Sequence, residues 1–364
     1  MAGAAKHAGL RRQWLELRLL CRPGIGLAAI APQLCRLARE IVGAEAASLF
    51  WLDREGMPLG FFHEDSPEAA CDLFINEFDR LFVGPDEINV FALAQRQDAA
   101  CGHLLAPPAS YFRSNTYNLL VRASGHHHCL DLRIDDAEGA RAVLLLFRGQ
   151  TPAFTDQDVG TVLQFMAPLR RAGMAGDIAH WHASEGPAGH VLIDPEDLRI
   201  LAMSDAADAL LRASNLVGQG LTLVGPLVRA PAFLAELCGP AMATGRASAD
   251  LEVPGGRLVL EASVIRSPLP DQLVPAQVLV QMSRKAPADV ALLDPILDLR
   301  LSPLRSEILF YAASGGRRDL LSRNFAISKE SAKKHLAEIY RAMNVGHWDE
   351  LATILRRDSG GGPT

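Results

Sequence analysis

Lysine is scarce in this chain of 364 residues. Only five of its 36 basic residues are lysines, and three of the five, Lys329, Lys333 and Lys334, fall within six residues of one another. The 36 basic and 42 acidic side chains give a net charge of −6, which argues against a protein that coats nucleic acid along its whole length. A local basic patch remains compatible with this balance.

Cysteine pairs and long apolar runs are also lacking. The six cysteines stand singly, with no Cys-x-x-Cys pair and no close histidine of the zinc type, so we interpret them as reduced thiols. The longest strongly apolar run, Ala142 to Phe147, is far shorter than the ~20 residues that cross a bilayer. Charged side chains interrupt the first 20 residues, against a secretory signal. The sequence predicts a cytoplasmic protein without a membrane partner.

Motifs of the common enzyme classes are missing as well. The chain has no Gly-x-Ser-x-Gly, no Gly-x4-Gly-Lys-Ser/Thr and no His-Glu-x-x-His. We therefore expect no enzymatic activity, no catalytic residue and no resident metal, and the sequence names no cofactor. The run His126-His127-His128-Cys129 invites a metal interpretation, but adjacent side chains of a strand point to opposite faces. We favour a loop entering a strand.

What is present is enough apolar sequence for ordinary cores, since 49% of residues are hydrophobic and 21% charged. At ~150 residues per domain, two or three domains are expected. Gly/Ala/Pro-rich joints divide the chain into residues 1–175, 186–285 and 301–358. Residues 286–300 are predicted to be a linker with up to one short helix. The stretch from Gly173 to Gly189 is predicted to be a loose joint, and Gly360 to Pro363 a frayed tail.

The first region combines a helix with several short strands. Apolar residues at spacings of four, three and four predict a helix from Leu27 to Val42. Thr155 is the expected N-cap of a closing helix. Short apolar or alternating runs predict strands at Ala47 to Asp53, Tyr117 to Arg122, Cys129 to Ile134 and Ala140 to Arg148. This order, closed by Phe154-Thr155 and Asp158 at the start of the last helix, resembles a GAF-type sensor domain.

The second region begins with two short apolar strands, Val191 to Asp194 and Arg199 to Ser204, followed by an Ala-rich helix capped by Ser204 or Asp205. Three more strands are expected at Ser248 to Val253, Arg257 to Ile265 and Ala276 to Ser283, with Pro254-Gly255-Gly256 as a hairpin turn. The order resembles a PAS domain. The expected fold is therefore a multidomain α+β sensor region, with GAF-like and then PAS-like antiparallel sheets, followed by an all-α C-terminal domain.

The third region carries start and stop signals for four helices. Ser302 and Pro303 begin the first helix, and Gly315-Gly316 end it. A short helix from Arg317 to Phe325 follows. Ser328 caps a third helix from Lys329 to Met343, and a fourth runs from about Trp348 to Arg356.

The third helix has two faces. Ala332, Leu336, Ile339 and Met343 recur at helical spacing and should pack on the preceding helices. The opposite side presents Glu330, Lys333, Lys334, Ala337, Glu338 and Arg341. From residue 301 to 357 there are ten basic and six acidic residues, so this region is near +4 while the rest of the chain is near −10. Two short helices before a third with a basic free face predict a helix-turn-helix.

At matching spacing this region resembles the LuxR-type (NarL-type) DNA-binding domain, on Leu301-Ser302-Pro303, Gly315, Ile327-Ser328, Ser331-Ala332-Lys333-Lys334-His335-Leu336, Ile339-Tyr340, Val345 and Glu350-Leu351. The resemblance implies a four-helix helix-turn-helix domain whose third helix reads the major groove of double-stranded DNA. The DNA-binding residues would be Lys329, Glu330, Ser331, Lys333, Lys334, His335, Ala337 and Arg341. Leu320, Ala326 and Trp348 depart from the family's usual glutamate, glycine and arginine, which puts an internal ion pair of the family in doubt.

Three functions stay open at this point. The leading one is a cytoplasmic one-component transcription regulator that binds operator DNA as a homodimer and senses a small-molecule effector in its GAF-like and PAS-like domains. Leu351, Ile354 and Leu355 are candidates for the dimer contact. A response regulator with a degenerate receiver is the first alternative, with Asp53 as phosphoacceptor, although no lysine occurs between Lys6 and Lys285. The second is an enzyme or ligand-binding module with a vestigial DNA-binding tail.

Overall fold

The structure is a computed structural model, and it describes residues 2–173, 181–183, 186–218, 222–224, 227–267 and 275–358. The joint predicted from Gly173 to Gly189 lies mostly outside these ranges, and the tail from Gly360 to Pro363 lies wholly outside them. The chain divides into two compact units. The helical unit consists of residues 1–26, 167–182 and 287–364, and the sheet unit of residues 27–166 and 183–286. The architecture is mixed α/β with antiparallel sheets.

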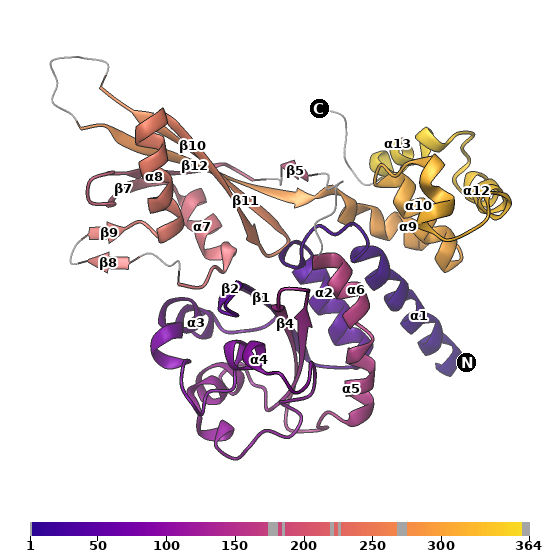
Figure 1. Ribbon diagram of the computed structural model, residues 1–364, viewed down its shortest axis with the longest axis horizontal. Coiled ribbons are helices and arrows are strands. Elements are labelled where there is room, and N and C mark those ends of the chain that lie inside the picture. The colour runs from indigo at the N-terminus through magenta and orange to yellow at the C-terminus, as the bar shows by residue number, and fades with distance from the viewer. Residues whose placement is uncertain are drawn as a thin grey trace. The chain divides into compact units, whose positions relative to one another are not determined.

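The first sheet of the sheet unit has four antiparallel strands in the order β2-β1-β4-β3. Figure 1 labels β1, β2 and β4 of this sheet. They are β1 (Ala46–Leu52), β2 (Pro58–His63), β3 (His128–Asp135) and β4 (Ala140–Arg148). Every residue of β1 is buried, so both faces of the sheet are covered. The helix α2 (Leu27–Val42) packs against β1, β2 and β4. Phe50 of β1 belongs to an apolar cluster with residues of α3 (Glu68–Leu81) and α4 (Val90–Gln95).

Most elements predicted for this region are confirmed, down to the cap of α5 (Asp156–Leu163). Thr155 and Asp158 form a reciprocal capping box, in which Asp158 Oδ2 accepts from Thr155 N at 2.8 Å. Arg148 lies 3.3 Å from both carboxylate oxygens of Asp158 and donates to Val42 O at 2.9 Å. A buried arginine thereby fastens the ends of α2, β4 and α5 together.

The strand predicted from Tyr117 to Arg122 is wrong. Thr116–Val121 forms a π-helical segment, preceded by a 3-10 turn at Tyr111–Arg113. The Glu87 carboxylate anchors its start by accepting from Asn115 N and Thr116 N, both at 2.8 Å. Tyr117 and Val121, four residues apart, are the buried apolar residues of the segment, which is a helical spacing.

The second sheet of the sheet unit follows the path β10-β11-β12-β6-β7. The strands are β6 (Gly189–Ile193), β7 (Ile200–Met203), β10 (Arg246–Val253), β11 (Gly256–Ile265) and β12 (Gln277–Pro287). Ser204 caps α7 (Asp205–Ser214) as predicted, and Val253 pairs with Gly256 across the predicted hairpin turn. The core beside this second sheet is filled by apolar side chains, including those of α8 (Ala232–Thr244). The remaining strands are β5 (Trp181–Ala183) and the hairpin of β8 (Thr222–Val224) and β9 (Leu227–Arg229).

Backbone hydrogen bonds join the two sheets of this unit. Asn215 O accepts from Phe61 N at 3.2 Å, and Leu59 O accepts from Val217 N at 3.0 Å, so the segment after α7 lies along β2. Gly255, in the β10–β11 turn with φ +72°, donates to Ala28 O at 3.0 Å. The two regions predicted as separate sensor domains therefore form one compact unit.

The helical unit contains α1 (Ala2–Leu20), α6 (Met166–Gly173), α9 (Leu293–Asp298), α10 (Pro303–Ala313), α11 (Leu321–Asn324), α12 (Lys329–Met343) and α13 (Trp348–Asp358). Short 3-10 turns at Ala288–Leu292 and Arg318–Leu320 precede α9 and α11. The predicted first domain, residues 1–175, places α1 and α6 with the first sheet, whereas the structure groups α1 and most of α6 with the C-terminal helices. None of the helices in the described ranges is long and apolar enough to span a bilayer.

The linker predicted for residues 286–300 contains the short helix α9, as the prediction allowed, but the segment is packed against other helices. Leu292, Leu293, Ile296 and Leu297 are buried, and α9 packs against α1, α10 and α13. Pro295 stands in the first turn of α9, where a missing N–H costs no hydrogen bond. This segment is part of the core of the helical unit.

Candidate functional site

The turn before α12 sets the direction of that helix. Ala326 adopts a left-handed conformation with φ +51°, and Ile327 N donates to Ser322 O at 3.1 Å. Ser328 then caps α12, since its Oγ accepts from Ser331 N at 3.1 Å. A left-handed residue after a helix is usually glycine, which agrees with the glycine expected at position 326 from the family resemblance. The helix begins and ends at the predicted residues.

The two faces predicted for α12 are present. Ala332, Leu336 and Ile339 are buried, and Met343 is half-buried. Of the eight residues predicted to bind DNA, six are exposed and form one continuous face: Lys329, Glu330, Lys333, Lys334, Ala337 and Arg341. The other two, Ser331 and His335, are half-buried at the flank.

His335 differs from the exposed residues of this face. Its Nδ1 is buried and has no hydrogen-bond partner among the described residues. An imidazole placed at the border between the two faces presents only part of its ring to a ligand. His335 is therefore less suited to contact a nucleic acid than the sequence suggests.

The exposed face of α12 carries cations that are weakly held. Lys334 pairs with Glu330 at 3.2 Å, but both side chains are more than three-quarters exposed (76% and 80%). Such an exposed pair is worth roughly 0.3–0.5 kcal/mol, so a stronger anion displaces it easily. In the described part of the chain, neither Lys329 nor Lys333 has an ion-pair partner within 4.0 Å. These lysines are available to an external polyanion.

An aromatic group supports the helices under α12. Tyr311 packs edge-on against Phe325 at 5.6 Å and against Trp348 at 6.4 Å between ring centroids. Trp348 Nε1 donates to Gly316 O at 3.1 Å, and Tyr311 Oη accepts from Asn324 Nδ2 at 2.9 Å. Ring packing and an indole hydrogen bond therefore hold Trp348 in place here.

The residues proposed for dimer contact on α13 are mostly buried. Leu351 and Leu355 are 0% and 1% exposed in a helix that packs on α10, and Ile354 is half-buried. Their spacing defines the face of α13 that packs against the other helices of the helical unit. That part of the prediction is wrong, because an amphipathic stripe does not tell an internal contact from an external one.

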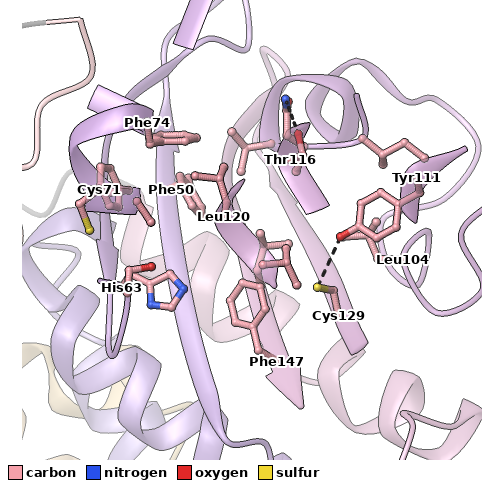
Figure 2. Close-up of a pocket in the computed structure, with 18 residues that line it drawn as sticks. Phe50, His63, Cys71, Phe74, Leu104, Tyr111, Thr116, Leu120, Cys129 and Phe147 are labelled. Atoms are coloured by element: carbon pink, nitrogen blue, oxygen red, sulfur yellow. Dashed lines mark hydrogen bonds between the residues drawn. The ribbon is translucent and has the colours of Figure 1, made fainter. Parts of the chain in front are cut away.

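The sheet unit encloses an apolar cavity between the first sheet and the helices on one of its faces (Figure 2). Its volume is about 60 Å³. At one side of the cavity lie the rings of Phe50, Phe61 and Phe74, whose centroids are 5.0 to 5.6 Å from one another. Leu104, Leu120, Val121, Leu145 and Phe147 are among the other apolar lining residues. Phe50 and Phe61 are buried residues of the apolar core that also line this cavity.

A few polar groups interrupt this lining. Tyr111 Oη and Cys129 Sγ are hydrogen-bonded at 3.7 Å, as the dashed line in Figure 2 shows. Burial raises the pKa of the Cys129 thiol to about 12, so the thiol is protonated at neutral pH and is a poor nucleophile. His63 also lines the cavity, and its Nδ1 lies 3.3 Å from Asp65 Oδ1. The lining of the cavity is thus mainly apolar, with few polar groups.

The other candidates from the sequence have local structural roles. The three histidines of the run reach different partners, Asp65 for His126, Tyr117 Oη for His127 and Gln150 O for His128. Within the described ranges no group of three or more side chains suited to hold a metal occurs. Asp53 Oδ1 accepts from Glu55 N at 2.9 Å and from Met57 N at 2.8 Å, which closes the β1–β2 turn.

Comparisons with known proteins add little to this geometry. No protein-family model and no curated protein matches the chain. Among solved structures, the crystal structure of the E. coli DhaR(N)-DhaL complex is similar at 14% identity, over 76% of this chain and 89% of that one, with a TM-score of 0.19. A likeness at that TM-score carries no argument about fold or function.

Proposed function

We propose that this protein is a DNA-binding transcription regulator of the LuxR type, in which α12 enters the major groove of operator DNA. One observation carries the proposal: six residues predicted to bind DNA, four of them cationic, share the exposed face of a capped 15-residue helix. An α-helix of this kind fits the major groove, and lysines there contact base edges or phosphates. Lys333, Lys334 and Ala337 are the residues that would face the bases.

The remainder of the helical unit supports this role. The two helices before α12, α10 and α11, are joined by a short connection, and Tyr311 links them through Phe325 and Asn324. The Ala326 turn then fixes the angle at which α12 leaves them. A helix held by buried contacts on one side and free on the other can dock without rearranging its support. We further propose that two copies bind paired half-sites, as helix-turn-helix proteins generally do.

The sheet unit is proposed as the sensor. Its first sheet supports a GAF-like domain and its second a PAS-like domain, by the order of their strands and helices. The cavity of about 60 Å³ is well below the ~300–1,000 Å³ of sites for drug-sized ligands, so the effector would be a small, mainly apolar molecule. The receiver alternative is less well supported, because Asp53 is engaged in a turn and both sheets are antiparallel.

Fluorescence anisotropy with labelled duplex DNA from upstream of its own gene tests the proposal on the full chain. Lys333→Ala or Lys334→Ala should each weaken binding by roughly 5- to 150-fold if the lysine reads a base, which corresponds to ~1–3 kcal/mol. Lys285→Ala, the same charge change on β12, is the matched control and should bind as the wild type does. Equal affinity in all four proteins would contradict the proposal.

A further inference from the structure

A second cavity lies within the helical unit, where the segment after α1 and the end of α6 meet α10 and α11. Its volume is about 360 Å³, which falls in the ~300–1,000 Å³ range of small-molecule sites. Arg22 and Arg171 contribute cations to its wall, and Ser314 and Asn324 contribute uncharged polar groups. The backbone holds the two arginines near each other, since Gly26 N donates to Ala172 O at 3.1 Å.

The charges around this cavity do not cancel. The Arg22 side chain is only 14% exposed, pairs with Glu307 at 3.1 Å and lies over the Phe325 ring at 4.2 Å. Burial lowers the pKa of Arg22, Glu307 partly offsets this, and Arg171 lowers the pKa further by repulsion. Arg171 is exposed, and among the described residues it has no hydrogen-bond or ion-pair partner. Two guanidinium groups therefore share one cavity, and the Glu307 carboxylate that pairs with Arg22 also lies 3.9 Å from Arg18.

Ser314 adds an uncharged polar group to the cavity wall. Ser314 lines the cavity, and its Oγ is buried without a hydrogen-bond partner in the described part of the chain. Native proteins rarely leave such a group unpaired, because the lost hydrogen bond to water is not replaced. An acceptor oxygen bound in the cavity would supply the partner.

We propose that this cavity binds a small organic oxyanion, a carboxylate or a phosphate ester, between Arg22 and Arg171, with Ser314 Oγ as a neutral donor. Planar guanidinium groups suit both oxyanions because their N–H groups match two oxygens at once. Phe310 and Pro23 give the cavity an apolar wall, which favours an organic anion over a bare ion.

The position of the site couples it to α12. Asn324 ends α11, and Phe325, which lies under Arg22, opens the turn that leads into α12. An anion held by Arg171 and Ser314 would tie α6 to the end of α10, beside that turn. This regulatory consequence rests on the proposed function, whereas anion binding itself does not.

Titration calorimetry on the full chain without DNA tests the site, with succinate and inorganic phosphate as probes at constant ionic strength. One-site saturable binding of at least one probe is expected. Arg171→Gln should weaken it at least ten-fold, and Ser314→Ala about three-fold or more. Arg170→Gln removes the same charge from the neighbouring position of α6, outside the cavity lining, and should leave binding unchanged.

Three results would overturn the proposal. The first is no saturable binding of either probe, and the second is equal binding by the wild type and Arg171→Gln. The third is a site that ignores both probes while Arg171→Gln lowers affinity for duplex DNA, which would make the cavity a contact for backbone phosphate. Probe binding that depends on Arg171 in a protein that does not bind DNA would support the anion site and remove the proposed function instead.

Discussion

Ala326, in the turn before α12, has a strained backbone conformation close to the candidate site. Its φ of +51° is a conformation that costs an L-residue roughly 1–2 kcal/mol and costs glycine almost nothing. Ala326→Gly should therefore raise the free energy of unfolding by roughly 1 kcal/mol, after the entropy cost of a more flexible unfolded chain. Chemical denaturation of the full chain measures the change.

The matched control for this prediction is Ala337→Gly, on the exposed face of α12. There glycine lacks the left-handed advantage and lowers helix stability by roughly 1 kcal/mol. The two glycine substitutions should thus shift the unfolding midpoint in opposite directions. A similar loss at both positions would show that the turn does not strain Ala326.

Asp158 carries a predicted dependence of stability on pH. Burial alone would raise its pKa, but hydrogen bonds from Thr155 and the Arg148 guanidinium outweigh burial and hold the pKa below its ordinary value. A lowered pKa in the folded state means that the carboxylate stabilises the fold above its unfolded pKa of ~3.9 and loses this effect as pH falls through the folded value.

Asp158→Asn should accordingly lower the free energy of unfolding by on the order of 2–3 kcal/mol at pH 7, because Arg148 keeps its buried position without an anionic partner. The gap to the wild type should close below pH 4. Asp156→Asn, an exposed first-turn residue, serves as control and should cost little. A gap that stays constant from pH 7 to pH 3 would rule out the ion pair as its source.

At the scale of elements, α2 and α12 were predictable to the residue. Each has an apolar stripe at helical spacing, and α12 also has a capping serine, so local sequence and tertiary burial agree. Most strands of the two larger sheets were predictable for a similar reason, being short apolar runs between Gly, Pro or Asp turns, but β2 was not predicted. The face of α12 followed from periodicity alone.

Other elements depended on contacts that the local sequence does not contain. The segment Thr116–Val121 is held in a helical turn by Glu87, 29 residues earlier than Thr116. The prolines of the α9 segment led to the prediction of a linker. In the structure, its buried leucines lie in a helix that packs against α1, α10 and α13. The apolar cavity draws residues from positions 50 to 147, so no short motif could have revealed it.

The α9 segment gives a prediction about fragments of the chain. A fragment of residues 287–364 keeps Leu292, Leu293, Ile296 and Leu297, whereas a fragment of residues 301–364 lacks them. Fully burying such a side chain contributes roughly 1.5–3 kcal/mol, so the shorter fragment should be several kcal/mol less stable and lose cooperative unfolding. Thermal unfolding followed by circular dichroism compares the two, and equal melting curves would show that α9 is dispensable.

At the scale of the whole molecule, three separate stretches of chain make up the helical unit. The N-terminal helix and residues 167–182 belong with the C-terminal helices, so a signal in the sheet unit has several covalent routes to α12. No motif or change in composition predicted this grouping, because α1 and α6 are next to elements of the first sheet in the chain. Composition can divide a sequence only into consecutive segments, whereas packing brings together segments that are far apart in the chain.

The sensor assignment predicts a difference between the full chain and its fragment. Compounds that change the DNA affinity of the full chain should leave the affinity of residues 287–364 unchanged, since this fragment lacks the apolar cavity. A panel of small aromatic compounds, tested by anisotropy on both proteins, makes the comparison. An identical response in the fragment would place the effector site outside the sheet unit.

The salt dependence of DNA binding tests the central proposal, that α12 docks on DNA, most directly. The slope of log K against log salt should be smaller by about 2 in the Lys333→Ala/Lys334→Ala double variant than in the wild type, if each lysine neutralises one phosphate. Lys285→Ala should keep the wild-type slope. If the double variant instead matches the wild type in both affinity and slope, α12 is not the surface that meets DNA.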